Sequence, residues 1–308
     1  MNTALLFPGQ GSQRVGMGRD LAHAHEIARK TYEEADQALG FPISKLCFEG
    51  PEDELTLTKN TQPAILTTSI AVFRVLQQEK GLTFDLVAGH SLGEWSALVA
   101  AGAIELRDAV RMTHLRGAFM QEAVPVGQGA MAALMGLDMA ATRAVCEKAG
   151  QPGQPVEPAN LNGGGQIVIS GHTDAIDRAI VEAKAAGAKI AKKLQVSAPF
   201  HCSMMKPAAD KLAEAMAGLK VSTPSVPVVA NVTAEPTTDA ARIKELLVQQ
   251  VTAPVRWEES VQTIAKLGVV KAYELGSGAV LKGLVKRIAS TIEVTTIGEP
   301  HEVAAFSS

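Results

Sequence analysis

The chain has 308 residues, of which 46% are hydrophobic and 20% charged, and its formal net charge is −3. This balance predicts a soluble globular protein, and the length favours two modest domains. So small a net charge gives no general attraction to nucleic acid or to an anionic membrane, and no apolar run reaches the roughly 18 residues of a membrane helix. We therefore expect no nucleic acid and no membrane among the partners.

Targeting and redox features are absent from the sequence pattern. The start, Met1-Asn2-Thr3-Ala4, has neither a basic segment nor an apolar secretory segment. Cys47, Cys146 and Cys202 are widely spaced, which predicts neither a disulfide framework nor a zinc site. We expect a cytoplasmic protein without a bound metal and, by default, a monomer.

Short β-like runs alternate with longer amphipathic stretches, as is typical of an α/β fold around a mostly parallel sheet. Residues 4–7 predict a first buried strand, and a helix is expected from Thr61-Gln62 and Pro63 to about Gly81. A second strand is expected at 86–88. Residues 89–93 then turn the chain into an alanine-rich helix.

The middle of the chain predicts a smaller unit. Strands are expected at 130–135, 156–161, 166–170 and 189–196, with helices at 138–149 and 173–186. The order βαββαβ is that of a ferredoxin-like domain, which we place at 127–197. Gly163-Gly164-Gly165 is expected at the turn of its central hairpin, where glycine tolerates positive φ.

The large-domain pattern resumes after Pro199. Strands are expected at 226–230 and 272–275, and Gly276-Ser277-Gly278 predicts a turn into a helix from about residue 280. The large domain, of α/β-hydrolase-like type, would therefore be discontinuous and comprise 1–126 and 198–308.

The strongest chemical signal is Gly89-His90-Ser91-Leu92-Gly93. A Gly-x-Ser-x-Gly turn between a strand and a helix exposes the serine as a nucleophile and directs backbone N–H groups and the helix dipole toward it. The Leu92 amide would then be one half of an oxyanion hole. The alternative is a glycine-rich turn with a capping serine.

A reactive serine requires a base, and the chain has seven histidines. His90 is adjacent to the serine but should leave the turn in another direction, and His114 lies within a predicted helix. His201 follows the small unit where the chain re-enters the large one, which is a natural place for a residue facing a cleft. The remaining histidines lie in polar or turn-like segments: His23, His25, His172 and His301. A lone histidine is more often inert, so the assignment of His201 stays open here.

One arginine lies on a predicted helix at about 104–122. Met112, Arg116 and Met120 share one face of it at i, i+4 and i+8. The arginine could extend to solvent, form an internal salt bridge, or bind a substrate carboxylate through planar bidentate geometry. The last possibility would select dicarboxylic acyl groups.

The loop Phe7-Pro8-Gly9-Gln10-Gly11-Ser12-Gln13 follows the first strand. It fails the dinucleotide-binding fingerprint, because Arg14 stands where G-x-G-x-x-G requires glycine. The Gln10 amide could instead be the second oxyanion donor.

Four ordered motifs together resemble the malonyl-CoA:acyl carrier protein transacylases. They are the loop at 7–13, the elbow at 89–94, Arg116-Gly117-x-x-Met120-Gln121, and Pro199-Phe200-His201. The resemblance extends from the first strand to about Leu284 and includes the βαββαβ insert.

The resemblance implies ping-pong acyl transfer. Ser91 would attack malonyl-CoA while His201 takes the proton, CoA would leave, and the phosphopantetheine thiol of holo acyl carrier protein would accept the malonyl group. Leu92 and Gln10 would supply the oxyanion hole, and Arg116 would bind the malonyl carboxylate. No cofactor is implied beyond the CoA thioester and the carrier's own phosphopantetheine, and fatty-acid synthesis is the default pathway.

Three further residues receive roles from the resemblance. The backbone carbonyl of Gln250 would orient His201, fixing its tautomer without supplying a full carboxylate charge. Phe200 should crowd an α-methyl branch and so favour malonyl over methylmalonyl, by about 1–3 kcal/mol. Met120, which shares the helix face of Arg116, is assigned to the substrate pocket.

The sequence departs from the family pattern at Trp95, where tyrosine is usual, at Gly163-Gly164-Gly165, where many members have Ser-Pro, and at Ser277, where proline is frequent. None of these changes removes a catalytic atom. They bear instead on carrier-protein affinity and loop stiffness, if these regions shape the cleft or its rim.

Other functions stay open at this stage. A carrier protein of polyketide synthesis or of malonate decarboxylase could be served in trans. A serine hydrolase would need an acid between Ser91 and His201 in chain order, and the candidates all look like helix-start or helix-surface residues: Asp108, Asp138, Asp174 and Asp177. A non-enzymatic docking module would retain the turn only for packing.

Overall fold

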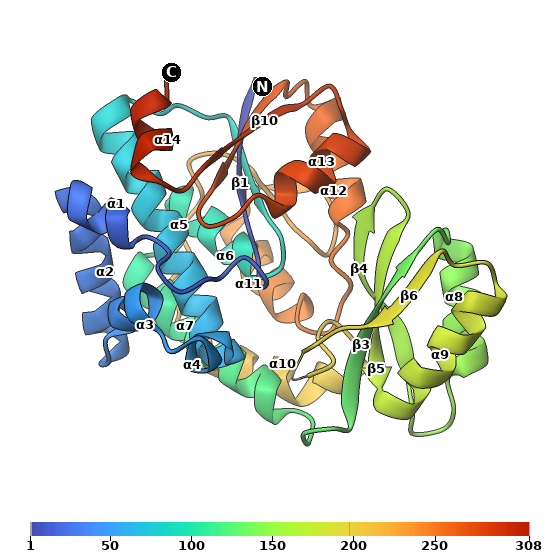
Figure 1. Cartoon of the computed structure of the whole chain (residues 1–308). Helices are drawn as coiled ribbons and strands as arrows, with labels where there is room; N and C mark the ends of the chain where they lie inside the picture. The colour runs from blue at the N-terminus through green and yellow to red at the C-terminus, as the bar shows by residue number, and fades with distance from the viewer. Residues whose placement is uncertain (1, 197, 308) are drawn as a thin grey trace.

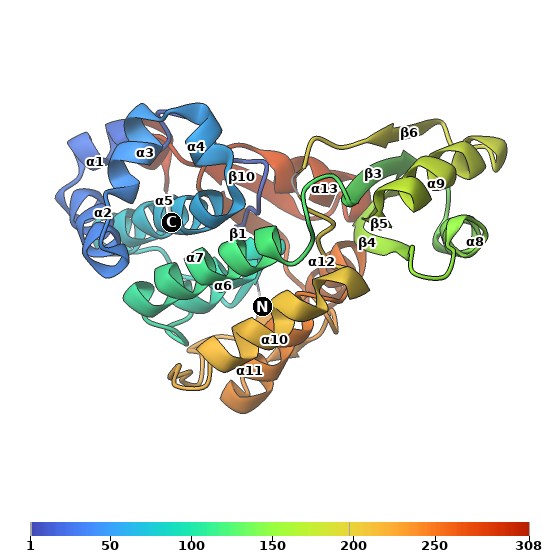
Figure 2. The ribbon, with the colours of Figure 1, turned by 90° about the horizontal axis from the view of Figure 1, so that it is seen from below.

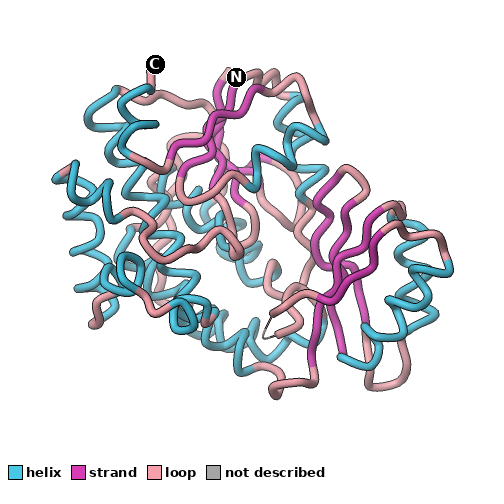
Figure 3. Tube along the Cα trace, in the orientation of Figure 1, coloured by secondary structure: helices cyan, strands magenta, loops and turns pink. Residues whose placement is uncertain are grey.

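Two β-sheets organise the molecule (Figure 1). The computed structural model describes residues 2–196 and 198–307, so Met1, Ser197 and Ser308, including the expected boundary at 197, lie outside it. In Figure 3 the strands form two separate groups, and Figure 2 shows the smaller group with its helices projecting to one side.

The larger sheet has six strands in the order β10-β9-β1-β2-β7-β8. Five run parallel, and only β8 is antiparallel to its neighbour β7. The predicted mostly parallel sheet is therefore confirmed. The strands are β1 Thr3–Phe7, β2 Leu86–Gly89, β7 Val228–Val229, β8 Pro236–Thr237, β9 Lys271–Leu275 and β10 Glu293–Ile297.

Side chains of this sheet alternate between two helical layers. Leu5 and Phe7 join one hydrophobic cluster, whereas Ala4 and Leu6 join another, because successive residues of a strand point to opposite faces. The first cluster includes helices α1 Arg19–Ala24, α2 Glu26–Leu39, α3 Ile43–Glu49, α4 Glu52–Thr56, α5 Thr58–Lys80, α6 Leu92–Ala100, α7 Leu106–Glu122, α10 Lys206–Ala215, α11 Ala240–Gln249 and α14 Pro300–Ala305. The second includes α12 Trp257–Lys266 and α13 Val280–Ile288.

Helix α5 begins earlier than the sequence predicts. It starts at Thr58, so Pro63 lies inside the helix, and the expected start at 61–63 is wrong. Proline has no N–H to donate to the carbonyl four residues earlier, here that of Lys59. The ring Nδ1 of His114 donates to that carbonyl oxygen across 2.8 Å, which compensates for the missing bond.

The smaller sheet is antiparallel, with the order β4-β5-β3-β6. Its strands are β3 Gly129–Met135, β4 Val156–Gly163, β5 Gln166–His172 and β6 Ile190–Lys193, and its helices are α8 Met139–Ala149 and α9 Thr173–Ala185. The predicted order of four strands and two helices is observed. Strand β6 is shorter than the predicted 189–196, because it pairs only with Ala132–Met135 of β3.

The two faces of the small sheet have different partners. Ala132 and Leu134 pack with α8 and α9 in a core of their own, while Met131 belongs to the large cluster. Strand β4 is tied to the large unit through the backbone, because Val255 donates to Ala159 O at 2.9 Å and accepts from Leu161 N at 2.9 Å. The small sheet therefore presents one face to the large unit.

The hairpin between β4 and β5 turns at three consecutive glycines. The φ angles of Gly163, Gly164 and Gly165 are 77°, 60° and 76°. The expected positive-φ turn is confirmed, and a side chain on any of these residues would be strained.

Two observations concern the cell environment. No helix within residues 2–196 and 198–307 is long and apolar enough to cross a membrane. Cys47, Cys146 and Cys202 are buried free thiols.

Candidate active site

The elbow around Ser91 joins β2 to α6 by an unusually close backbone approach. Ser91 has φ 49° and ψ −106°, a conformation that non-glycine residues rarely adopt. A Cβ on Gly89 would lie 2.0 Å from the Gly93 carbonyl carbon, and one on Gly93 would lie 2.0 Å from Phe7 O. Both glycines are required because the backbone passes where a side chain would be.

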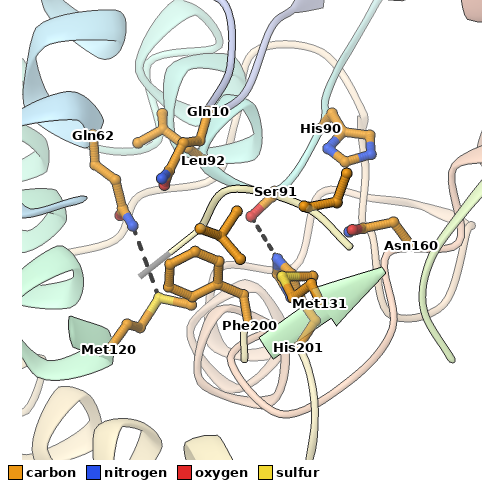
Figure 4. Close-up of a pocket in the computed structure, with 12 residues that line it drawn as sticks. Gln10, Gln62, His90, Ser91, Leu92, Met120, Met131, Asn160, Phe200 and His201 are labelled. Carbon is orange, nitrogen blue, oxygen red and sulfur yellow. Dashed lines mark hydrogen bonds between the residues drawn. The ribbon is translucent and has the colours of Figure 1, made fainter. Parts of the chain in front are cut away.

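The hydroxyl of Ser91 contacts His201. Ser91 Oγ lies 2.7 Å from His201 Nε2 (Figure 4). His201 Nδ1 lies 2.8 Å from the backbone O of Gln250. A carbonyl can only accept, so Nδ1 carries the proton and Nε2 is free to accept one from the serine. The sequence-predicted serine, base and orienting carbonyl are thus brought together.

His201 is held neutral. It is 4% exposed, and its φ of 61° is a second positive value at a non-glycine residue of the site. Burial, followed by the positive charge of Arg116, lowers the pKa of His201 to about 3. At neutral pH the ring can therefore act as a base.

Arg116 is fully buried and lies beneath the serine. It donates from Nη1 to Gln62 Oε1 at 2.7 Å and from Nη2 to Gln250 Oε1 at 2.8 Å, and Nη2 also lies 3.3 Å from Ser91 Oγ. Its Nε has no partner within the described part of the chain. Burial lowers the pKa of Arg116 to about 10, against the opposing influence of Glu94.

The two structural alternatives for Arg116 do not hold. The side chain does not extend to solvent, since the residue is only 1% exposed. It also forms no ion pair with any carboxylate among residues 2–196 and 198–307. A buried cation without an anionic partner is suited to binding an anionic ligand.

A cavity of about 150 Å³ opens onto the serine. Met120 and Phe200 both line it, as the sequence assignment of these residues to the substrate pocket requires (Figure 4). Arg116 is not part of the lining, but its Nη1 donates to Gln62 and its Nη2 lies near Ser91, and both of these residues line the cavity. The lining comprises Gln10, Gln62, His90, Ser91, Leu92, Met120, Met131, Asn160, Leu194, Val196, Phe200 and His201.

The expected oxyanion donors also face this cavity. Leu92 is the first residue of α6, so its N–H has no acceptor within the helix. Gln10 is exposed in the loop after β1, and its side-chain amide lies 3.5 Å from Thr58 Oγ1. Leu92 and Gln10 both line the cavity that Ser91 borders.

Four of the other histidines have partners elsewhere: His25, His90, His114 and His172. His90 Nε2 lies 2.9 Å from Asn162 Oδ1, and burial lowers the pKa of His90. His25 pairs with Glu79. Of the histidines that the structure describes, only His201 is hydrogen-bonded to Ser91.

The acid that a serine hydrolase would need is not in place. Asp138 caps α8, Asp174 lies in the first turn of α9, Asp108 lies in that of α7, and Asp177 pairs with Lys193. His201 Nδ1 is bonded to a peptide carbonyl. The expected helix-start and helix-surface positions of these aspartates are confirmed.

The three departures from the family pattern lie away from the cavity lining. Trp95 is fully buried in the large core, so the idea that it shapes a rim is wrong. Gly163 and Gly164 face Ile288 and Arg287 of α13. Ser277 is also buried.

Sequence reasoning missed three residues that support the site: Gln62, Glu94 and Asn231. Asn231 Oδ1 accepts from Ser91 N at 2.7 Å, and its Nδ2 donates to Gly89 O at 2.7 Å. Glu94 lies three residues after the serine and is 3% exposed. The sequence offered one signal for Glu94: it is an acidic residue on the helix face that must pack against the sheet.

Comparison with known proteins places the chain in one family. The family model described as the acyl transferase domain matches residues 4–290. The malonyl CoA-acyl carrier protein transacylase of Escherichia coli K12 is 51% identical over 302 residues, covering 98% of this chain and 97% of that protein. The protein of the same name from Bacillus subtilis 168 is 48% identical over 300 residues, covering 97% and 94%.

Solved structures agree. An acyl carrier protein S-malonyltransferase from Vibrio cholerae superposes with a TM-score of 0.96 at 46% identity, covering 99% of both chains. A malonyl-transacylase in complex with a type II PKS acyl-carrier protein gives the same score and identity, covering 99% of this chain and 98% of that one.

Proposed function

Because this chain belongs to the malonyl-CoA:acyl carrier protein transacylases, we propose that Ser91 carries the malonyl group between two thiols in a ping-pong reaction. The enzyme transfers malonyl from malonyl-CoA to acyl carrier protein, which supplies fatty acid synthesis. Each half-reaction moves the acyl group between Ser91 and one thiol, and His201 serves as the base in both.

In the first half-reaction, His201 Nε2 takes the proton of Ser91 as Oγ attacks the thioester carbonyl. The 2.7 Å contact already places base and nucleophile at hydrogen-bonding distance. The oxyanion is held by the N–H groups of Leu92 and Gln10. When the carbonyl re-forms, the C–S bond breaks and CoA leaves with the proton from His201.

The second half-reaction runs the same steps in reverse with a different thiol. The phosphopantetheine sulfur of the carrier gives its proton to His201 and attacks the malonyl ester. The C–O bond to Ser91 breaks, and the proton returns to Oγ. Throughout, the Gln250 carbonyl keeps Nδ1 protonated, so that Nε2 is the atom that exchanges protons.

The observation that carries the malonyl assignment is the buried, ion-pair-free Arg116 with Nη2 3.3 Å from the nucleophile. Gln62 and Gln250 each accept one of the five guanidinium N–H groups, so a carboxylate can be bound by the remaining donors or by displacing one of these amide oxygens. A bound carboxylate would also offset the charge that helps to lower the pKa of His201, making the base stronger when malonyl is present.

Phe200 and Met120 are proposed to set the shape of the acyl site. Both are buried and line a cavity of about 150 Å³. The Phe200 ring leaves little room for an α-methyl branch, but one methyl group changes the free energy by only about 1–3 kcal/mol. We expect preference for malonyl over methylmalonyl and not exclusion.

The direct test is intact-protein mass spectrometry. Wild type incubated with malonyl-CoA should gain one malonyl group that peptide mapping locates at Ser91, and holo acyl carrier protein should remove it. Ser91→Ala is the matched control and should gain nothing. A folded wild type that gains no adduct would refute the mechanism, and an adduct that water removes as fast as the carrier does would indicate a hydrolase.

The carrier protein could also belong to polyketide synthesis. The observation that favours this second candidate is the likeness to a malonyl-transacylase in complex with a type II PKS acyl-carrier protein. Comparing transfer rates to fatty-acid and polyketide carriers would separate the two.

The finer architecture is likewise proposed. Residues 1–126 and 198–308 would form an α/β-hydrolase-like domain, supported by the strand–elbow–helix at Ser91, and 127–197 a ferredoxin-like insert, supported by its strand order. Val126, 93% exposed, fits a boundary there. We also propose a cytoplasmic monomer that needs no cofactor, since the free thiols fit a reducing compartment and Ser91 and His201 supply the reacting groups.

A further inference from the structure

The strained backbone of Ser91 is held on both sides by side-chain amides. Its N–H donates to Asn231 Oδ1 at 2.7 Å, and its carbonyl accepts from Gln250 Nε2 at 3.1 Å. These bonds hold the serine at φ 49°, a conformation that costs energy and persists only where the surroundings enforce it. Asn231 and Gln250 are therefore supports of the nucleophile.

Both supports converge on one oxygen of Glu94. Glu94 Oε2 accepts from the backbone N–H of Asn231 at 2.9 Å and from Gln250 Nε2 at 2.8 Å. Asn231 and Gln250 are fully buried, so loss of these bonds would leave buried polar groups unpaired. A change at Glu94 would therefore affect the residues that bind both the N–H and the carbonyl of Ser91.

Gln250 connects Glu94 to Arg116 and His201 through hydrogen bonds. Its side-chain Oε1 accepts from Arg116, and its backbone O accepts from His201. The Gln250 side-chain amide thus lies between a buried cation and a buried carboxylate: its oxygen accepts from Arg116 and its nitrogen donates to Glu94. Glu94 contacts no reacting atom itself, but the two donors to its Oε2 both belong to this network.

We propose that ionised Glu94 is a positioning residue for acyl transfer, holding Asn231 and Gln250 so that Ser91, His201 and Arg116 keep their reactive geometry. The proposal rests on the proposed function of Ser91 and adds to it a charged group that the reaction steps do not use. It predicts that the charge matters as well as the hydrogen bonds.

A second buried glutamate shows what a purely structural role looks like. Glu274 is also fully buried, and its two oxygens accept from the backbone N–H groups of Leu281 and Lys282 at the start of α13. These bonds cap a helix and reach no residue of the site. Glu94 differs because it accepts from the backbone of one support of the nucleophile and from the side chain of the other.

The charged and titratable groups near Glu94 are few. Arg116 on α7 is the charged group that acts on it. His90 is partly buried and His201 is buried, and burial lowers the pKa of both. Burial raises the pKa of Glu94 to about 7, despite its hydrogen bonds and Arg116. Ionisation of Glu94 therefore falls within an accessible pH range.

The test compares Glu94→Gln with Glu274→Gln by the rate at which malonyl-CoA acylates Ser91. Glutamine keeps an acceptor oxygen of the same reach, removes the charge and replaces the other oxygen with an NH2 group. At pH 8 we expect Glu94→Gln to acylate at least about tenfold more slowly, and Glu274→Gln to stay within about twofold of wild type. A Glu94→Gln rate within twofold of wild type would overturn the proposal.

The pH dependence of the acylation rate distinguishes an effect of the Glu94 charge from an effect of packing. The wild-type rate should fall as pH drops through about 7 and approach the Glu94→Gln rate near pH 5.5, while Glu94→Gln itself stays flat, because it imitates the protonated acid. Should Glu94→Gln fail to fold, the wild-type profile alone decides, and a flat profile from pH 8 to 5.5 would overturn the proposal. Absence of any adduct in wild type would instead refute the proposed function.

Discussion

Two glycine-rich turns of this chain look alike in sequence and differ in physics. At the elbow, Gly89 and Gly93 have no positive φ and are needed because backbone lies within 2.0 Å of where their Cβ atoms would be. At the hairpin, Gly163, Gly164 and Gly165 all have positive φ, and side chains of α13 stand nearest to the first two.

The cost of positive φ is placed differently in the two turns. In the hairpin the residues with positive φ are glycines, for which this conformation costs little. At the elbow the residue with positive φ is Ser91, and His201 also has a positive φ, which costs energy for a residue with a side chain. Around the elbow lie three buried groups with large pKa shifts, Glu94, Arg116 and His201. Glycine thus provides space at the site and conformational freedom at the hairpin.

The largest effect is expected from Gly93→Ala at the elbow. Within a helix, alanine is normally favoured over glycine by about 0.5–1 kcal/mol. Here its Cβ would lie 2.0 Å from Phe7 O, so α6 must move and carry Ser91 with it. We expect acylation to fall by about 100-fold or more, as a displacement of about 1 Å can cause. Wild-type activity in a folded variant would contradict the spatial explanation.

Arg116→Ala probes the unpaired charge near the elbow. Hydrogen bonds to charged groups contribute about 1.5–3 kcal/mol each, so malonyl transfer should fall by about 10- to 100-fold. Transfer of an uncharged acetyl group should be unchanged or faster. The measurement is kcat/KM for both thioesters with the same carrier, and an equal loss for both would rule out the carboxylate role.

The buried charge of Glu94 should also be visible in stability. Its pKa in the folded state is about 7 against an ordinary value of 4.5, so the wild type loses stability as pH rises from 4.5 to 7. Relative to Glu94→Gln, the loss should be on the order of 3 kcal/mol. Urea unfolding of both proteins at pH 5 and pH 8 measures it. A difference that does not change with pH would show that folding leaves the pKa of Glu94 at its ordinary value.

The smallest effect is expected at the hairpin, from Gly164→Ala. A left-handed φ costs an alanine roughly 1–2 kcal/mol, and the nearest atoms belong to the flexible Arg287 side chain. The melting temperature should fall by a few degrees, with acylation unchanged. More than a twofold loss of activity would mean that this hairpin contributes to the site after all.

Much of the fold follows from local pattern in the sequence. The strand and the helix that flank the elbow and the βαββαβ order were predictable because their periodicity and turn residues are local. The start of α5 was not, because the carbonyl left free by Pro63 is satisfied by His114, which is distant in sequence. The shortness of β6 likewise depends on its partner strand.

The site divides in the same way. Ser91 is visible in its own pentapeptide. His201 and Arg116 were candidates from their places in the chain and received their roles from the family resemblance, which alone indicated Gln250. Glu94 and Asn231 were not predicted, because their importance lies in hydrogen bonds to other residues of the site. The two residues are bonded to each other although they are 137 residues apart along the chain. No spacing rule connects a carboxylate on α6 to the residue that follows β7.

The backbone tie between β4 and Val255 has a consequence for protein engineering. Met131 and Asn160 of the small sheet form part of the cavity wall, while Ser91 and Arg116 belong to the large unit. A chimera that exchanged residues 127–197 with a homologue would inherit that wall and leave the nucleophile and the guanidinium untouched. The exchanged segment would need a strand that pairs with Val255 as β4 does here. Val255 lies five residues after Gln250, so a poor match would disturb the Gln250 carbonyl that orients His201.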